Sequence, residues 1–300
     1  MIKLPENRVI ITVAQTGAFL EMDSSYVPSK PDQIAQSAYE CYNEGAAIVH
    51  VHARDEEGKP TVSPETFQEI HAKIRAKCPI IIQDTTGGGT VILKDEAGNP
   101  LPIAATKEQR ISCFDTNQPP EMASLNMGTQ LYTIGPRAGS PWMNPRNTIE
   151  YFALQMKEKG IKPVIEIYQP GMLREFRNLI DKDLLKKPYY VDLIFNTAFQ
   201  GAIEAHPKWL MTSLVMLPED SIFCVLSREE GHLPMVTLAM ILGGCVRTGF
   251  EDVTYCRKGE YAKSNAQLVA RLVRIARELG KEPATSDEAR EILSIKPLKT

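Results

Sequence analysis

The 300-residue sequence lacks the features of several common classes of protein. Its formal net charge is only −3 and no basic run stands out, which argues against a nucleic-acid-binding surface. No apolar run approaches the ~20 residues that span a bilayer, and the first residues contain no apolar segment of the signal-peptide type. We therefore expect a globular protein of the cytoplasm.

Cysteine pairs and dinucleotide-binding glycines are also absent. The six cysteines are scattered, with no C-x-x-C pair, and such cysteines in a reducing compartment are usually buried thiols rather than disulfides or metal ligands. No G-x-G-x-x-G follows the first predicted strand, which would be expected in an open dinucleotide-binding sheet. The sequence therefore predicts neither a disulfide framework nor a dinucleotide-binding domain.

Short apolar runs alternate with segments that carry helix signals. This pattern predicts a (β/α)8 TIM barrel of the α/β class, which needs roughly 250 residues. We expect one such domain over residues 1–300, with a short C-terminal helical extension and a hairpin within residues 91–102. The eight predicted strands are 9–14, 47–51, 79–83, 122–126, 163–168, 190–196, 222–226 and 245–250.

The second predicted strand ends in two histidines one residue apart, His50 and His52. Side chains at i and i+2 on a strand point to the same side, so the two imidazoles converge. Two neutral imidazoles at one point suit a divalent transition metal, most often zinc, with cobalt, manganese or nickel as alternatives. The competing interpretation is that each ring is a core residue with a satisfied N–H group.

Further polar residues follow the other strands. The active site of such a barrel lies at the carboxyl ends of its strands, and strands two and eight both flank strand one. A carboxylate after strand eight can therefore reach a metal held by strand two and leave positions open for a substrate. His232 is a spare candidate ligand. The polar residues at these ends are His50, His52, Thr85, Thr86, Asn126, Glu166, Arg228, Glu251 and Asp252.

Arg247 and Asp252 lie close together in the sequence of the eighth strand and its exit. An arginine beside a carboxylate keeps it ionised and oriented, which suits a base that acts on a carbon acid. A structural ion pair at the barrel rim is the alternative. The run Thr85-Thr86-Gly87-Gly88-Gly89 offers N–H groups and hydroxyls to an anion, or is simply a flexible turn. Glu166 either orients an active-site group or pairs inside the barrel.

Five motifs in order resemble those of the beta-keto acid cleavage enzymes, whose best-known activity is 3-keto-5-aminohexanoate cleavage. The resemblance covers nearly the whole chain. The motifs are H-x-H-x-R-[DE] at 50–55, [ST]-T-G-G at 85–88, P-E-M-A-[ST]-L-N at 120–126, E-[IV]-Y at 166–168 and G-G-x-[IV]-R-x-G-[FL]-E-D at 243–252.

The resemblance implies a zinc-dependent barrel, commonly a homotetramer, that acts as a carbon–carbon-cleaving acyltransferase. A β-keto acid and acetyl-CoA would give acetoacetate and a new acyl-CoA through a retro-Claisen cleavage. By carry-over, His50, His52 and Glu251 would hold the metal. Asp252, supported by Arg247, would take the proton from the substrate carbon.

Other positions match or depart from the family pattern. Thr85 and Glu166 match catalytic positions. Where the aminohexanoate-cleaving members carry a glutamate that receives the substrate amine, this chain has Phe19, so we expect a substrate without that amine. Substrate binding is assigned to Thr86, Gly87, Gly88, Ser124, Asn126 and Phe19.

Two other functions compete with this one. The chain could be another zinc-dependent barrel enzyme, a hydrolase or aldolase, or a non-catalytic binding protein built on the barrel. Strict dependence on acetyl-CoA would separate the first from the acyltransferase. Ligand binding without turnover would identify the second.

Overall fold

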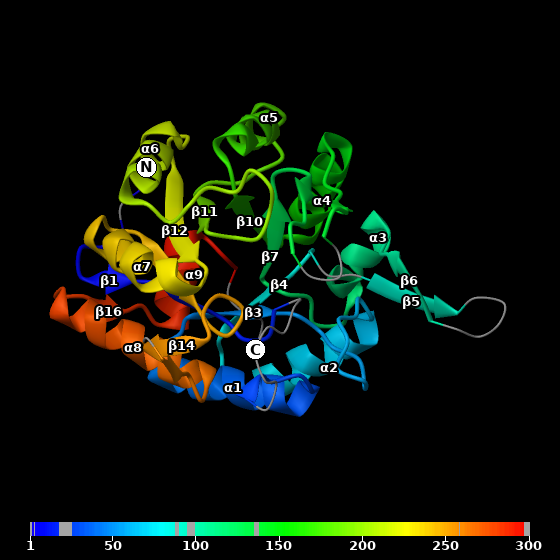
Figure 1. Ribbon diagram of the computed structural model, residues 1–300, viewed down its shortest axis with the longest axis horizontal. Coiled ribbons are helices and arrows are strands. Elements are labelled where there is room, and N and C mark those ends of the chain that lie inside the picture. Colours follow the sequence, from blue (N-terminus) through cyan, green and yellow to red (C-terminus); the bar gives the residue numbers. More distant parts are fainter. Residues whose placement is uncertain are drawn as a thin grey trace.

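A closed barrel of eight parallel strands forms the centre of the structure (Figure 1). The computed structural model describes residues 2, 4–17, 26–87, 90–94, 100–134, 138–257 and 259–296. The predicted TIM barrel is confirmed, and the eight predicted strands agree with the observed ones to within two residues at each end. In barrel order the strands are β2 (Ile11–Ala14), β3 (Ile48–Val51), β4 (Ile81–Asp84), β7 (Met122–Asn126), β10 (Lys162–Ile167), β11 (Tyr189–Phe195), β12 (Ser221–Ser227) and β13 (Cys245–Thr248).

Helices surround the barrel and begin and end at recognisable residues. Ser63 accepts a hydrogen bond from the Thr66 N–H group at the start of α2, and Gly45, with φ 109°, ends α1. The helices are α1 (Pro31–Glu44), α2 (Pro64–Arg75), α3 (Lys107–Arg110), α4 (Arg146–Lys159), α5 (Leu173–Asp181), α6 (Pro207–Met216), α7 (His232–Ile241), α8 (Asn265–Glu278) and α9 (Ser286–Leu293). None of the described helices is long and apolar enough to cross a membrane.

In the described part of the chain, four short strand pairs lie outside the barrel. The hairpin predicted within 91–102 is confirmed by the pairing of β5 with β6, and the residues 95–99 that connect the two strands lie outside the described residues. A pairing of β8 with β9 lies between β7 and α4. The pairs are β5 (Thr90–Lys94) with β6 (Pro100–Ala104), β8 (Gln130–Leu131) with β9 (Pro141–Trp142), β14 (Tyr255–Arg257) with β15 (Glu260–Tyr261), and β1 (Arg8–Val9) with β16 (Glu282–Pro283).

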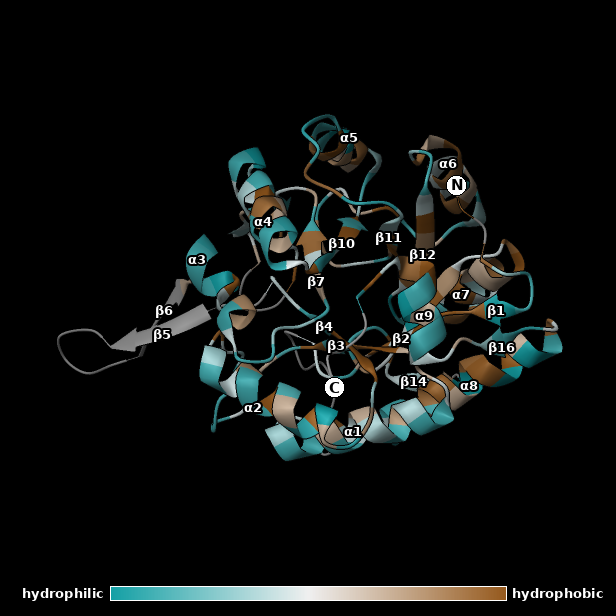
Figure 2. Ribbon diagram, turned by 180° about the vertical axis from the view of Figure 1, so that it is seen from behind, coloured by the Kyte–Doolittle hydropathy of each residue, from teal (hydrophilic) through white to brown (hydrophobic). Residues whose placement is uncertain are grey.

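The predicted C-terminal extension closes the amino end of the barrel. Figure 2 shows α9 in front of the strands at this end. Its first residue, Ser286, donates a hydrogen bond to the carbonyl of Ala47, just before β3. Arg290 of the same helix pairs with Glu121, just before β7. The amino end is therefore covered, and the carboxyl end remains for a site.

The barrel interior changes from apolar to polar along the strands. Inward-facing residues near the amino ends are apolar and pack into one buried cluster with α9. Because side chains at i and i+2 share a face, the next inward-facing layer lies two residues further along. The apolar layer includes Ile48, Ile81, Met122, Val164, Tyr190 and Ile222, and the layer above it His50, Gln83, Ser124, Glu166, Asp192 and Cys224.

Candidate active site

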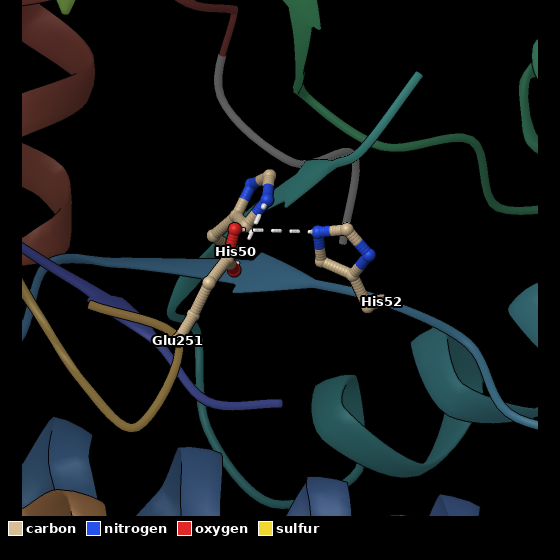
Figure 3. Close-up of side chains that lie close together, drawn as sticks. All are labelled: His50, His52 and Glu251. Atoms are coloured by element: carbon tan, nitrogen blue, oxygen red, sulfur yellow. Dashed lines mark ion pairs between the residues drawn. The ribbon is translucent and has the colours of Figure 1, made fainter. Parts of the chain in front are cut away.

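Two imidazoles and one carboxylate meet at the carboxyl ends of β3 and β13. The Nε2 atom of His50 lies 3.6 Å from Oε2 of Glu251, and Nε2 of His52 lies 3.5 Å from Oε1 (Figure 3). One ligand atom from each residue lies within 4.8 Å of the other two. Since β3 and β13 both pair with β2, residues far apart in sequence are brought together as predicted.

Two glycines allow Glu251 to reach the histidines. Gly249 has φ 133°, and a Cβ atom there would lie 2.1 Å from the carbonyl oxygen of Ala14. Just beyond it, the Glu251 N–H group donates to that same oxygen. A Cβ atom on Gly17 would lie 2.9 Å from Cγ of Glu251. A side chain at either position would therefore displace the carboxylate.

The three residues fit a divalent metal ion. Four ligands bound at ~2.0–2.2 Å to zinc lie ~3.3–3.6 Å from one another in a tetrahedral arrangement, close to the two imidazole–carboxylate distances given above. Burial lowers the pKa of His50 well below its usual range, so its ring is neutral and able to ligate. The Oε2 atom of Glu251 is buried without a hydrogen-bond donor in the described structure.

Arg247 links the two carboxylates after β13. Its Nε and Nη2 atoms each lie 3.0 Å from an oxygen of Asp252, and Nη2 also lies 2.9 Å from Glu251. Burial opposes the charge of Arg247, but the neighbouring carboxylates raise its pKa above the usual range. Burial raises the pKa of Asp252 to about 6, while Arg247 works in the opposite direction. The predicted contact between Arg247 and Asp252 is therefore confirmed as a buried bidentate pair.

His232 supports Arg247 instead of joining the group of His50, His52 and Glu251. Its Nε2 atom lies 3.1 Å from the carbonyl oxygen of Arg247 and donates to it. Burial lowers the pKa of His232 to about 4, so the ring is neutral. Among the described residues the ligand group contains His50, His52 and Glu251 only, and the prediction of His232 as a spare ligand is wrong.

Two further carboxyl groups lie inside the barrel below this site. Glu166 of β10 is in register with Asp192 of β11, and both are buried. Burial raises the pKa of Glu166 to about 8 and that of Asp192 to about 6. The Tyr168 hydroxyl group donates to Glu166 over 3.4 Å. Asp192 was not predicted as a site residue, although it shows the same signal as Glu166, an acidic residue within an apolar strand.

The turn after β4 is tied to β7 by hydrogen bonds. The Thr86 N–H group donates to Oγ of Ser124, and the Gly87 N–H group donates to Oγ1 of Thr85. These two amides already have acceptors within the protein, so the expectation that they are open to an anion is wrong for Thr86 and Gly87. Asn126 ends β7 and accepts from the Gly128 N–H group. The other predicted substrate contacts, Gly88 and Phe19, lie outside the described residues.

Arg54, the arginine of the H-x-H-x-R-[DE] motif, is a supporting residue whose role the motif alone did not reveal. It donates to the carbonyl of Gly17 over 2.6 Å and to that of Gly58 over 3.0 Å. These bonds tie the start of the loop after β2, next to Glu251, to the loop after β3. The arginine of the H-x-H-x-R motif therefore positions the backbone around the ligand group.

Comparisons with known proteins agree with this geometry. The sequence model of the beta-keto acid cleavage enzyme family matches residues 8–295. A 3-keto-5-aminohexanoate cleavage enzyme of Fusobacterium nucleatum is 36% identical over 293 residues, covering 96% of this chain and 98% of that protein. A 3,5-dioxohexanoate:acetyl-CoA acetone transferase of Paraburkholderia graminis is 31% identical, covering 97% of each.

A solved structure supports the same fold. The ternary complex of ObcA with a C4-CoA adduct and oxalate superimposes with a TM-score of 0.68 at 15% identity. The match covers 90% of this chain and 68% of that one. Together, the barrel, the ligand group at its carboxyl end and the family match over nearly all residues lead to one conclusion. The chain belongs to the beta-keto acid cleavage enzyme family.

Proposed function

We propose that this protein cleaves a β-keto acid with acetyl-CoA and releases acetoacetate and a new acyl-CoA. The observation that carries the proposal is the convergence of the ligand group with the Arg247–Asp252 pair in a chain of this family. The related transferase of P. graminis is named for acetyl-CoA, which supports the same co-substrate here. A hydrolase or aldolase would have no need for that co-substrate.

His50, His52 and Glu251 would hold a divalent metal ion, for which we propose zinc. When bound, such an ion supplies Lewis-acid stabilisation to the keto and carboxylate oxygens of the substrate. The buried negative charge favours a cation here, because among the described residues one arginine, Arg247, forms ion pairs with both Glu251 and Asp252. Arg54 also interacts electrostatically with Glu251, but its guanidinium group donates its hydrogen bonds to two backbone carbonyls, those of Gly17 and Gly58.

Asp252 would act as the base. It takes the proton from the carbon between the two carbonyl groups, and the bidentate Arg247 holds the carboxylate in a fixed orientation. The carbanion then attacks the acetyl thioester, and the thiolate of CoA leaves. This thiolate attacks the original keto carbon and breaks the carbon–carbon bond. Asp252 returns its proton to the departing acetoacetate carbanion, so Asp252 ends the cycle ionised and no net proton is gained or lost.

Other residues would position the reacting groups. With its raised pKa, Glu166 carries a proton near neutral pH and can donate a hydrogen bond from the barrel interior. The hydroxyl groups of Thr85 and Ser124 fix the turn after β4 beside the site. Asn126 offers its amide to the substrate. On the family resemblance we further propose one barrel domain over residues 1–300, a homotetramer and a cytoplasmic location.

Acetoacetate release tests the proposed function. The purified protein is incubated with a series of β-keto acids, with and without acetyl-CoA, and with and without a metal chelator. We expect acetoacetate and a new acyl-CoA only when acetyl-CoA and metal are both present. Cleavage of the β-keto acid without acetyl-CoA would identify a hydrolase or aldolase instead.

A further inference from the structure

A buried guanidinium group lies above the turn that follows β4. Arg110, the last residue of α3, is 9% exposed. Its Nε atom donates to the carbonyl of Thr86 over 2.7 Å, and Nη1 donates to the carbonyl of Met143 over 3.1 Å. The guanidinium lies 4.9 Å from the centre of the Phe152 ring. Its Nη2 group is buried and has no acceptor in the described structure.

The charge of Arg110 has no ionised partner among the described residues. Burial lowers its pKa to about 10, so the group stays cationic at neutral pH. The carboxyl group that acts on it is Glu166, which is mostly protonated at that pH. A buried cation without a counter-ion is costly unless a ligand supplies the missing charge. Arg110 thus has the chemistry of an anion-binding group.

Two more donors without acceptors surround the same turn. The Nε1 atom of Trp142 and the Nδ2 atom of Asn126 are buried and have no partner in the part of the chain described. Arginine and tryptophan side chains only donate, and Oδ1 of Asn126 already accepts from Gly128. Three buried donors therefore lack an acceptor, one each from α3, β7 and β9. A ligand with acceptor oxygens, such as a carboxylate, would satisfy them.

Packing places Trp142 and Arg110 beside one another. The Cζ2 atom of the indole lies 2.7 Å from the point where a Cβ atom on Gly87 would stand, and Cζ2 belongs to the ring edge that carries the N–H group. Arg110 binds the carbonyl of Thr86 on one side and that of Met143, the residue after Trp142, on the other. Both side chains therefore contact the segment Thr86–Gly87.

This position is within reach of a short substrate tail. In the barrel β4 follows β3 and β7 follows β4, so the turn after β4 and Asn126 at the end of β7 lie on the same rim of the barrel as His50. Tyr168 and Phe199 pack against Trp142 with ring centres 6.3 and 5.7 Å away. Such rings alone could attract an ammonium group, but the adjacent guanidinium would repel it.

We propose that Arg110, together with Trp142 and Asn126, selects β-keto acids whose tail ends in a carboxylate. The inference rests on the proposed function for the reaction, but it concerns the end of the substrate that does not react. Arg110 is a specificity residue in this scheme. If it only clamped α3 to the turn, its loss would affect every substrate equally.

Matched substrates separate the two roles. The holoenzyme is assayed with acetyl-CoA and β-keto acids whose tails end in a carboxylate, a carboxamide or an ammonium group. We expect the wild type to prefer the carboxylate by ~10–100-fold in kcat/KM, as a charge-assisted hydrogen bond predicts. Arg110→Met should lose most of that preference and change the carboxamide substrate less than ~3-fold, while Arg110→Lys should restore part of it. Arg290→Met, a buried arginine at the other end of the barrel, is the matched control and should keep the preference.

A binding assay without turnover separates this inference from the proposed reaction. The chain has two tryptophans, so Trp209→Phe leaves Trp142 as the reporter. Glutarate should change its fluorescence at lower concentration than glutaramate, which has an amide at one end, and Arg110→Met should abolish the difference. If glutarate is favoured but no β-keto acid is cleaved, the proposed reaction is wrong, whereas the selection of a carboxylate by Arg110 is supported. Equal handling of carboxylate and carboxamide by the wild type, or equal losses on both in Arg110→Met, would overturn it.

Discussion

The two ends of the barrel each hold a buried arginine between two carboxylates, but they differ in what remains unpaired. At the amino end Arg290 donates to Glu121, Asp287 and the carbonyl of Pro79. The second oxygen of Glu121 accepts from the Ile82 N–H group. Each of these polar groups has a partner within the protein, so the cluster serves to hold α9 on the strands.

At the carboxyl end the corresponding cluster leaves atoms without partners. Arg247 binds Asp252 and Glu251, yet one oxygen of Glu251 and Nδ1 of His50 are buried and lack hydrogen bonds in the described structure. Groups left in this state cost stability unless a ligand completes them. A cluster whose polar atoms all have partners within the protein holds the fold together, whereas a cluster with buried polar atoms that lack partners marks a place for a ligand.

The largest effect should follow removal of a metal ligand. His50→Ala takes away one of three donors, so we expect metal binding to be lost and kcat/KM to fall by ~10³-fold, since Lewis-acid stabilisation is worth several kcal/mol. Metal content after dialysis and acetoacetate release measure the two effects. His206→Ala, at an exposed histidine that caps α6, should change neither. A variant at position 50 that keeps the metal at wild-type affinity would remove the proposed ligand set.

The proposed base can be tested while the metal is left in place. Asp252→Asn keeps the size of the side chain but removes the proton acceptor, so kcat should fall by ~10²–10⁴-fold with metal content unchanged. Asp287→Asn makes the same chemical change beside Arg290, where the carboxylate is exposed, and should leave kcat unaltered. A kcat within tenfold of wild type in Asp252→Asn would assign the proton transfer to another group.

At the amino end the expected loss is one of stability. Arg290→Met leaves Glu121 as an uncompensated buried charge and should lower the free energy of unfolding by ~3–5 kcal/mol. The kcat of the folded variant should stay near the wild-type value. Denaturant unfolding and acetoacetate release measure both quantities, and Arg290→Met combined with Glu121→Leu should recover most of the stability. A loss of activity without a loss of stability would contradict the structural role of this end.

Regular geometry predicted the barrel and the meeting of His50 and His52 with a carboxylate after strand eight, whereas the choice of Glu251 as a proposed metal ligand came from the family resemblance. Strand alternation placed His50 and His52 on one face, and barrel closure placed Glu251 near them. Neither conclusion needed the position of a single loop. The same alternation could have identified Asp192, because Asp192 is in register with Glu166 on the adjacent strand.

The parts that could not be predicted depend on contacts between loops. His232 lies just after β12 and was a candidate ligand from the sequence, but its ring donates a hydrogen bond to the backbone carbonyl of Arg247. Arg110 lies on a four-residue helix, and nothing in the local sequence reveals that its guanidinium is buried against the turn after β4. Such contacts arise from tertiary packing, for which hydrophobic periodicity carries no signal.

The most gradual of the expected effects concerns the carboxyl group inside the barrel. Burial raises the pKa of Glu166 to about 8 from the usual value of 4.5. Between these two pH values the folded protein keeps a proton that the unfolded chain has released, so the contribution of Glu166 to stability falls as pH rises from about 4.5 to about 8. Glu166→Gln removes the ionisable group. Relative to wild type, the metal-free variant should therefore gain stability steadily across this range.

Urea unfolding of the metal-free proteins at about pH 5, 6.5 and 8 measures this gain, which should level off above about pH 8. Glu121→Gln is the control from the amino end, where the loss of the ion pair with Arg290 should destabilise the protein throughout the range. A gain that does not depend on pH would mean that Glu166 has the same ionisation in the folded and unfolded states. In that case Arg247 would compensate the charge of Glu166, as Arg290 compensates that of Glu121 at the amino end. The two ends of the barrel would then differ electrostatically only in the residues after β13.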